Sequence, residues 1–220
     1  MKIFTLMISL LFISSSPVYA GMFDALPKLP IEIPGLGGGD KADSSGLEST
    51  QSKLADRTNK VMGDFVGALD KFRGALDLDK DSSLKDKFAN CGSGKICTDS
   101  ADIERIESQA KEVVEKIEQM KKDGVKLSAG ASKTFLEGLL PYGKGILKSG
   151  VLGTDIAAFA PKVASAVQAN PLKAPSQLAV AITIIKQIPP ILSTFGGANG
   201  GIYDYATYNG IEAPEDTGPE

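Results

Sequence analysis

The chain contains no histidine and no tryptophan, and only two of its 220 residues are cysteines. Histidine is the commonest general base and the commonest metal ligand, so its absence removes the usual starting points for a catalytic triad or a zinc site. A G-x-S-x-G nucleophile elbow is also missing. We therefore expect a non-enzymatic protein with no cofactor and no bound metal. A hydrolase that uses two paired carboxylates is the enzymatic alternative.

Basic charge is too sparse to indicate nucleic-acid binding. The formal net charge is −3, and no dense lysine and arginine face is interleaved with aromatic residues. The charge is unevenly divided, however. Residues 127–200 contain six basic and two acidic residues, whereas residues 201–220 contain five acidic and no basic ones. This pattern indicates an apolar, mildly basic block followed by an acidic tail.

A long hydrophobic run is absent from the N-terminus, although a short one is present. Lys2 precedes an apolar stretch from Ile3 to Ile13, and small residues follow up to Ala20. Spanning a bilayer takes about 20 apolar residues, roughly twice the length of this stretch. The arrangement is typical of a cleavable signal peptide. We expect cleavage after Ala20 and a mature protein, residues 21–220, in the periplasm or outside the cell.

The two cysteines, Cys91 and Cys97, enclose a Gly-Ser-Gly-Lys sequence. A phosphate-binding loop requires a glycine where Ala89 stands and a serine or threonine where Ile96 stands. A redox pair would normally be C-x-x-C. In an exported protein, an isolated pair at this spacing predicts a disulfide, and two free thiols are the alternative.

An acidic stretch, Asp77–Asp81, resembles the opening of a calcium-binding loop. The glycine and the glutamate that an EF-hand needs are replaced by Ser82 and Phe88. We expect a solvated acidic loop, and a weak exposed calcium site is the alternative.

Hydrophobic spacing predicts helices throughout the central chain. An apolar stripe covers residues 47–76, and a 3-4-3-4-3 stripe covers residues 100–122, with Ser100 as the expected N-cap and Gly124 as the expected stop. These two helices are expected to form an αα-hairpin with coiled-coil-like packing. Beyond them, glycines and prolines predict short interrupted helices over 128–153. A helix over 155–169 and another from about 175 to 188 follow, and Pro189-Pro190 is expected to kink or end the last one.

The expected fold is therefore all-α, a bundle of about four to six helices. The signal peptide (1–20) is followed by an extended arm and linker rich in proline and glycine, which we call the arm (21–46). The helical domain (47–198) precedes a flexible tail rich in glycine and tyrosine (199–220).

Three of the five tyrosines fall within seven residues, at Tyr203, Tyr205 and Tyr208. They are candidate contacts for a partner, and incidental tyrosines in a disordered tail are the alternative. Taken together, the sequence predicts an exported protein that binds an envelope protein or an apolar ligand. The alternative is a membrane-active protein whose residues 127–200 associate with or insert into a bilayer.

Overall fold

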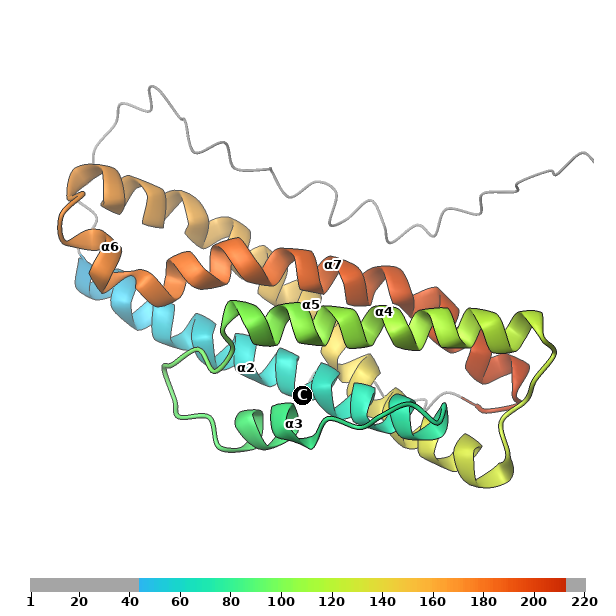
Figure 1. Ribbon diagram of the computed structural model, residues 1–220. Coiled ribbons are helices and arrows are strands. Elements are labelled where there is room, and N and C mark those ends of the chain that lie inside the picture. Colours follow the sequence, from blue (N-terminus) through green and yellow to red (C-terminus); the bar gives the residue numbers. More distant parts are fainter. Residues whose placement is uncertain (1–43, 213–220) are drawn as a thin grey trace, which may run out of the picture.

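The computed structural model describes residues 44–212, which form six helices and no strand (Figure 1). The signal peptide, the arm up to residue 43 and residues 213–220 lie outside this range. The helices are α2 (Ser44–Ala75), α3 (Ser82–Ala89), α4 (Ser100–Lys122), α5 (Ala129–Ala169), α6 (Ala174–Gln177) and α7 (Ala179–Tyr208). The predicted all-α bundle is confirmed.

The most extensive interface joins α2 to α5, which run antiparallel. Ion pairs spaced along both helices fix their register: Arg57 with Asp155, Asp64 with Lys148, and Lys71 with Glu137. Between these pairs, the apolar stripe that predicted α2 is buried against α5 and α7. The stripe therefore forms the centre of the core.

Two glycines let α5 approach α2 closely. A methyl group built on Gly145 would lie 2.7 Å from the ring of Phe65, and one on Gly138 would lie 2.7 Å from the ring of Phe72. Neither phenylalanine can easily retreat, because both rings are fully buried and Phe65 stacks on Phe195 with 3.9 Å between centroids. The glycines in α5 thus serve helix packing.

The αα-hairpin predicted for residues 47–76 and 100–122 is wrong, because the connection contains a helix of its own. Helix α3 returns the chain along α2, and the cysteine loop then reaches the middle of α2, where Cys97 N donates to Asn59. Helix α4 starts there and runs parallel to α2, so that Arg73 pairs with Glu112 much further along both helices. The main partner of α4 is α7.

The ends of α4 follow from local chemistry, with one correction. The N-cap is Asp99 and not Ser100: Asp99 Oδ1 accepts from Asp102 N at 2.9 Å, and Asp102 Oδ2 accepts from Asp99 N at 3.1 Å, which completes a capping box. The predicted stop at Gly124 is confirmed, since this residue has a φ of +68°. Glycine adopts that conformation without a steric penalty.

The short helices predicted for residues 128–169 are in fact one helix, the 41-residue α5, which contains Pro141 and Pro161. A proline has no N–H group to donate to the carbonyl four residues earlier. The proline and this freed carbonyl lie on the same face of the helix. Pro161 is exposed and Pro141 is half-buried. Water can therefore solvate the freed carbonyl groups, and the helix continues.

The predicted start of the C-terminal tail, at residue 199, is also wrong, because α7 continues past it. This helix passes through Pro189 and Pro190 and ends at Tyr208, so residues 199–208 belong to the helix and not to a flexible tail. Its buried side chains recur at helical spacing and contact α4, α5 and α2. The tail that begins beyond this helix lies mostly outside the described residues.

Candidate functional site

The cysteine segment is a disulfide-closed loop fixed to α2. Cys91 and Cys97 are bonded, with their Cα atoms 5.9 Å apart. Asp56 of α2 accepts hydrogen bonds from Gly94 N at 2.7 Å and from Ser93 Oγ at 2.9 Å. Gly94 has a φ of +73°, which suits glycine. The Gly-Ser-Gly-Lys sequence is therefore a turn whose backbone amide points to a carboxylate and not to a phosphate.

The double variant Cys91→Ser/Cys97→Ser should lose about 2 kcal/mol of unfolding free energy, because opening a seven-residue ring restores entropy to the unfolded chain. Urea unfolding of the mature protein, followed by far-UV circular dichroism, measures the change. Reductant added to the native sequence should give the same loss. An unchanged midpoint in both experiments would mean that the contacts with Asp56 and Asn59 hold the loop without the ring.

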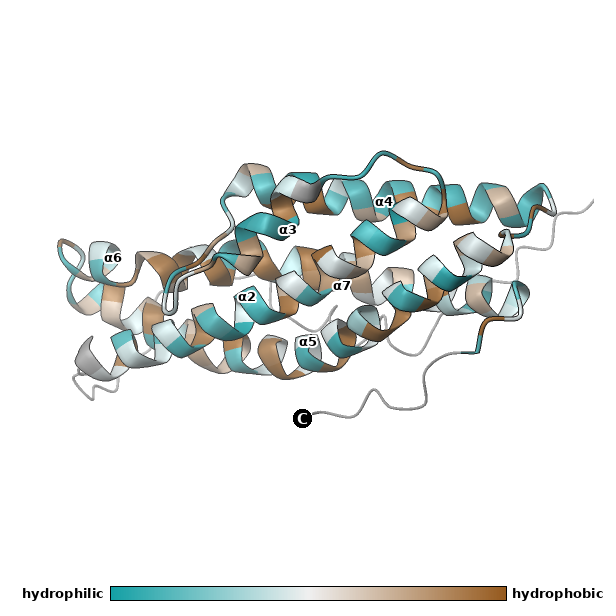
Figure 2. Ribbon diagram, turned by 90° about the horizontal axis from the view of Figure 1, so that it is seen from below, coloured by the Kyte–Doolittle hydropathy of each residue, from teal (hydrophilic) through white to brown (hydrophobic). Residues whose placement is uncertain are grey.

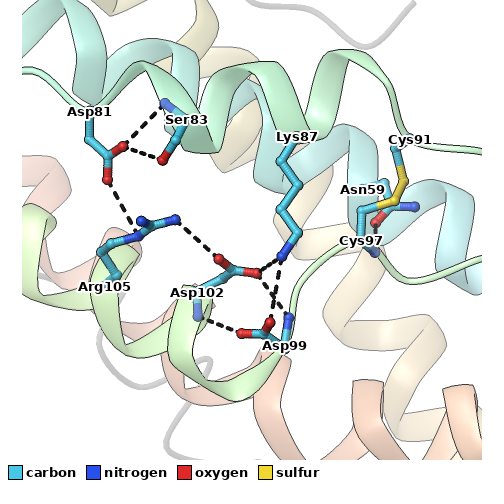
Figure 3. A network of polar contacts seen from close by, with 9 residues as sticks. All are labelled: Asn59, Asp81, Ser83, Lys87, Cys91, Cys97, Asp99, Asp102 and Arg105. Atoms are coloured by element: carbon cyan, nitrogen blue, oxygen red, sulfur yellow. Dashed lines mark hydrogen bonds and ion pairs between the residues drawn. A yellow bond between two sulfur atoms is a disulfide. The ribbon is translucent and has the colours of Figure 1, made fainter.

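A network of charged groups fastens α3 to the start of α4 (Figure 3). Asp102, only 7% exposed, pairs with Lys87 of α3 and accepts from Arg105 Nη2 at 3.1 Å. Arg105 Nε lies 3.3 Å from Asp81, the N-cap of α3. Hydrogen bonding from Ser83 lowers the pKa of Asp81. Asp81 is thus held ionised by its donors and by Arg105, and Asp102 is occupied by Lys87 and Arg105.

A shallow depression of about 640 Å³ lies beside this network. Its lining is largely polar and includes Lys87, Asn90, Thr98 and Asp99. Ser83 Oγ, which also lines it, donates to Asp81 Oδ1 at 2.6 Å, but this carboxylate caps α3 and pairs with Arg105. The depression is too open to enclose an apolar ligand.

The acidic stretch at 77–81 does not assemble as a calcium loop. Asp81 is engaged by Ser83 and Arg105, and Asp77 is exposed at the turn after α2, with a φ of +57°. Across residues 44–212, no three cysteine, aspartate or glutamate side chains converge in a way that could hold a metal ion.

The three candidate tyrosines occupy different environments on α7. Tyr205 is 0% exposed and packs edge-on against Phe135, with 5.6 Å between centroids, so in this structure it faces the core and is not accessible to a partner. Tyr203 and Tyr208 are half-buried, and the ammonium of Lys126 lies 5.3 Å from the Tyr208 ring centroid. The sequence did contain a signal for this arrangement. Ala198, Ile202 and Tyr205 are spaced by four and three residues, which is typical of the buried face of a helix.

The outer face of α5 carries a row of exposed large apolar side chains, a feature that sequence reasoning missed. They are Leu136, Leu140, Leu147 and Val151, exposed by 39%, 40%, 41% and 58%, and we call them the α5 row. Their spacing of 4, 7 and 4 residues places them on one side of the helix, opposite Gly138 and Gly145, which face α2. Hydrophobic residues recur along the whole of α5 (Figure 2).

The charge around the α5 row is basic. Lys133 and Lys162 are exposed on the same side of α5. The two carboxylates of α5 are both engaged by α2, with Glu137 bound to Lys71 and Asp155 to Arg57. The row therefore lies between lysines, with its nearby acids neutralised.

One helix of the described residues, α7, is long and apolar enough to cross a membrane. In the bundle it supplies core residues such as Ile188, Leu192 and Phe195, which are at most 1% exposed. Core helices of soluble proteins have the same composition, so the apolar sequence of α7 does not by itself indicate a membrane span. No protein-family model, curated protein sequence or solved structure matches this chain.

Proposed function

We propose that this is an exported, non-enzymatic binding protein of the cell envelope whose partner is another protein that docks on the α5 row. The signal-peptide pattern and the disulfide support export, since disulfides persist in oxidising compartments. The α5 row is the observation that carries the binding proposal. Its aliphatic side chains are aligned along more than four turns of a rigid helix, as in groove-binding surfaces.

The remaining surface features favour binding over catalysis. The charged groups between α3 and α4 pair with one another, and the one hydroxyl–carboxylate pair beside the depression, Ser83 with Asp81, serves to cap α3. The openness of that depression and the close packing of the aromatic core favour a protein partner over an apolar small molecule.

The double variant Leu140→Ser/Leu147→Ser should reduce capture of the partner from an envelope extract more than tenfold, because two central apolar contacts are lost. Its unfolding free energy should fall by about 1–2 kcal/mol, because serine is the poorer helix former and each leucine is only 40–41% exposed. This loss is small beside the roughly 5–15 kcal/mol of a typical domain, so the variant should remain folded. Leu172→Ser, at a residue that is 92% exposed outside the row, is the matched control and should capture normally. Equal capture by all three proteins would refute the proposal.

A second candidate, association of residues 127–200 with a membrane, is favoured by Lys133 and Lys162, which flank the α5 row. Apolar side chains beside lysines are typical of helices that lie on anionic bilayers. Flotation of the mature protein with vesicles containing anionic lipid tests it. Protein that floats, and that remains at the bottom when Leu140 and Leu147 are serine, would favour the membrane over a protein partner.

A further inference from the structure

Helix α3 belongs to a segment that is anchored at both ends but weakly seated in between. We propose that this segment, residues 80–90, which we call the strap, opens as a unit while the rest of the bundle stays folded. The strap contains α3 and is held shut by ion pairs to α4. Its opening would make the exposure of Leu84, which belongs to the hydrophobic core, depend on ionic strength.

The two ends of the strap are anchored to α2. Before the strap, Arg73, a residue only 6% exposed, donates from Nε to the carbonyl of Asp79 at 2.5 Å. After the strap, the disulfide-closed loop binds Asn59, which accepts from Cys97 N at 3.2 Å and donates to the carbonyl of Lys95 at 2.6 Å. The segment that can move is therefore limited to the residues between these two anchors.

The apolar seat of the strap is small. Among the strap side chains that the structure describes, only Leu84 is buried, and Phe88 is half-buried. Helix α4, by comparison, buries an apolar side chain on almost every turn. A helix of eight residues, such as α3, is not stable in water by itself. Helix α3 therefore depends on contacts with its neighbours, and these contacts bury little apolar surface.

Charged side chains attach the strap to α4 (Figure 3). Lys87 pairs with Asp102 and lies 3.6 Å from Asp99, and Arg105 Nε lies 3.3 Å from Asp81. The side chains of Lys87 and Arg105 are 39% and 43% exposed, so solvent and salt screen these pairs. The attachment to α4 should consequently weaken as the ionic strength rises.

The strap is separate from the surface on which the proposed function rests. Its main helix neighbour is α2, whereas the α5 row faces away from α2. The proposal therefore does not depend on a partner at the α5 row, and its tests need only the mature protein. A segment with few buried apolar contacts is the kind that opens at a free energy well below that of global unfolding.

Hydrogen exchange of the mature protein, followed by NMR, tests the opening. The amides at the end of α3, such as Asn90 N, which donates to Asp86 O at 3.1 Å, should exchange at least about a hundredfold faster than core amides such as that of Phe65, after correction for intrinsic rates. Gly94 N, bound to Asp56 beyond the second anchor, should exchange more slowly than the α3 amides.

Two results of this experiment would overturn the proposal. Exchange of the α3 amides at the rate of the core amides would mean that the strap opens only when the whole bundle unfolds. Exchange of Gly94 N at the rate of the α3 amides would mean that the disulfide-closed loop opens too and is not an anchor.

Two lysine variants test the ion pairs. Lys87→Gln removes the contacts with Asp99 and Asp102, and should speed exchange of the α3 amides about five- to tenfold. Lys111→Gln is the matched control, because Lys111 is 62% exposed and pairs with Glu107 inside α4. This control should leave the α3 amides unchanged. Equal rates in the two variants would refute the role of the ion pairs.

Salt tests the same attachment without a substitution. Raising the ionic strength from about 0.02 M to about 0.5 M shortens the Debye length from about 20 Å to about 4 Å. Relative to a synthetic peptide of residues 80–90 under the same conditions, the α3 amides should exchange several-fold faster at the higher ionic strength. The response should be smaller in Lys87→Gln. Rates that do not respond to salt would overturn the proposal that ion pairs hold the strap shut.

Discussion

Replacing Gly145 with alanine is expected to lower the free energy of unfolding by about 2–3 kcal/mol, although alanine is the better helix former by about 1 kcal/mol. The added methyl group would lie 2.7 Å from Cε1 and 2.8 Å from Cδ1 of Phe65. The ring cannot shift away, because its other face stacks on Phe195 with an interplanar angle of 4°. Helices α2 and α5 would have to separate, and the contact between Gly138 and Phe72 would loosen with them.

The same helix supplies a control of opposite sign. Gly150 is also inside α5, but a methyl group there would meet no atom within 4 Å. Gly150→Ala should therefore stabilise the protein by about 0.5–1 kcal/mol, through lower entropy of the unfolded chain. Urea unfolding of both variants measures the pair. Equal effects of the same sign would contradict close packing at Gly145.

This pair of glycines also shows where sequence reasoning stopped. Glycine within a helical pattern weakens the helix, which is why residues 128–153 were expected to be interrupted. What compensates at Gly145 is the Phe65 ring, 80 residues earlier in the chain, and no local pattern reveals such a contact. In α4, by contrast, the apolar stripe and Gly124 act locally, and the prediction placed the end of that helix correctly.

The α5 row could not be predicted for a related reason. Helix α5 is apolar on several sides, so its sequence does not say which side faces the core. That choice is made by α2, whose phenylalanines select the face that contains Gly138 and Gly145. Leu140 and Leu147 consequently lie on the outside. The disulfide, in contrast, depends only on two cysteines and their spacing, and it was predicted in full.

Alkaline pH is expected to destabilise the protein steeply through Tyr142. Its side chain is 1% exposed, and its hydroxyl donates to the carbonyl of Phe195 at 2.6 Å. Burial raises the pKa of Tyr142 far above its ordinary value of 10.0. Burial also raises the pKa values of Tyr203 and Tyr205. These phenols keep their protons in the folded protein at a pH where the unfolded chain has lost them.

The direction in which the unfolding free energy changes with pH follows from the number of protons that each state binds. Below pH 10 both states hold the proton, and the full stability is present. As the pH rises above 10, the unfolded chain binds fewer protons than the folded one, so Tyr142 alone should cost about 1.4 kcal/mol per pH unit until its folded pKa is reached. Urea unfolding at pH 8 to 11.5 should show this fall. The part of the phenolate absorbance at 295 nm that belongs to Tyr142, obtained by subtracting the Tyr142→Phe curve, should rise together with unfolding and not before it.

Tyr142→Phe isolates this residue from the other groups that titrate in the same range. Lys71 and Lys87, whose pKa values are raised by hydrogen bonds to Glu137 and Asp102, respond alike in both proteins. At pH 8 the variant should be less stable by about 1 kcal/mol, because the carbonyl of Phe195 loses its donor. Its stability should fall more slowly with pH, so the two curves should cross near about pH 11. Parallel curves would mean that water reaches the Tyr142 hydroxyl, and that the aromatic core between α2, α5 and α7 is looser than the structure shows.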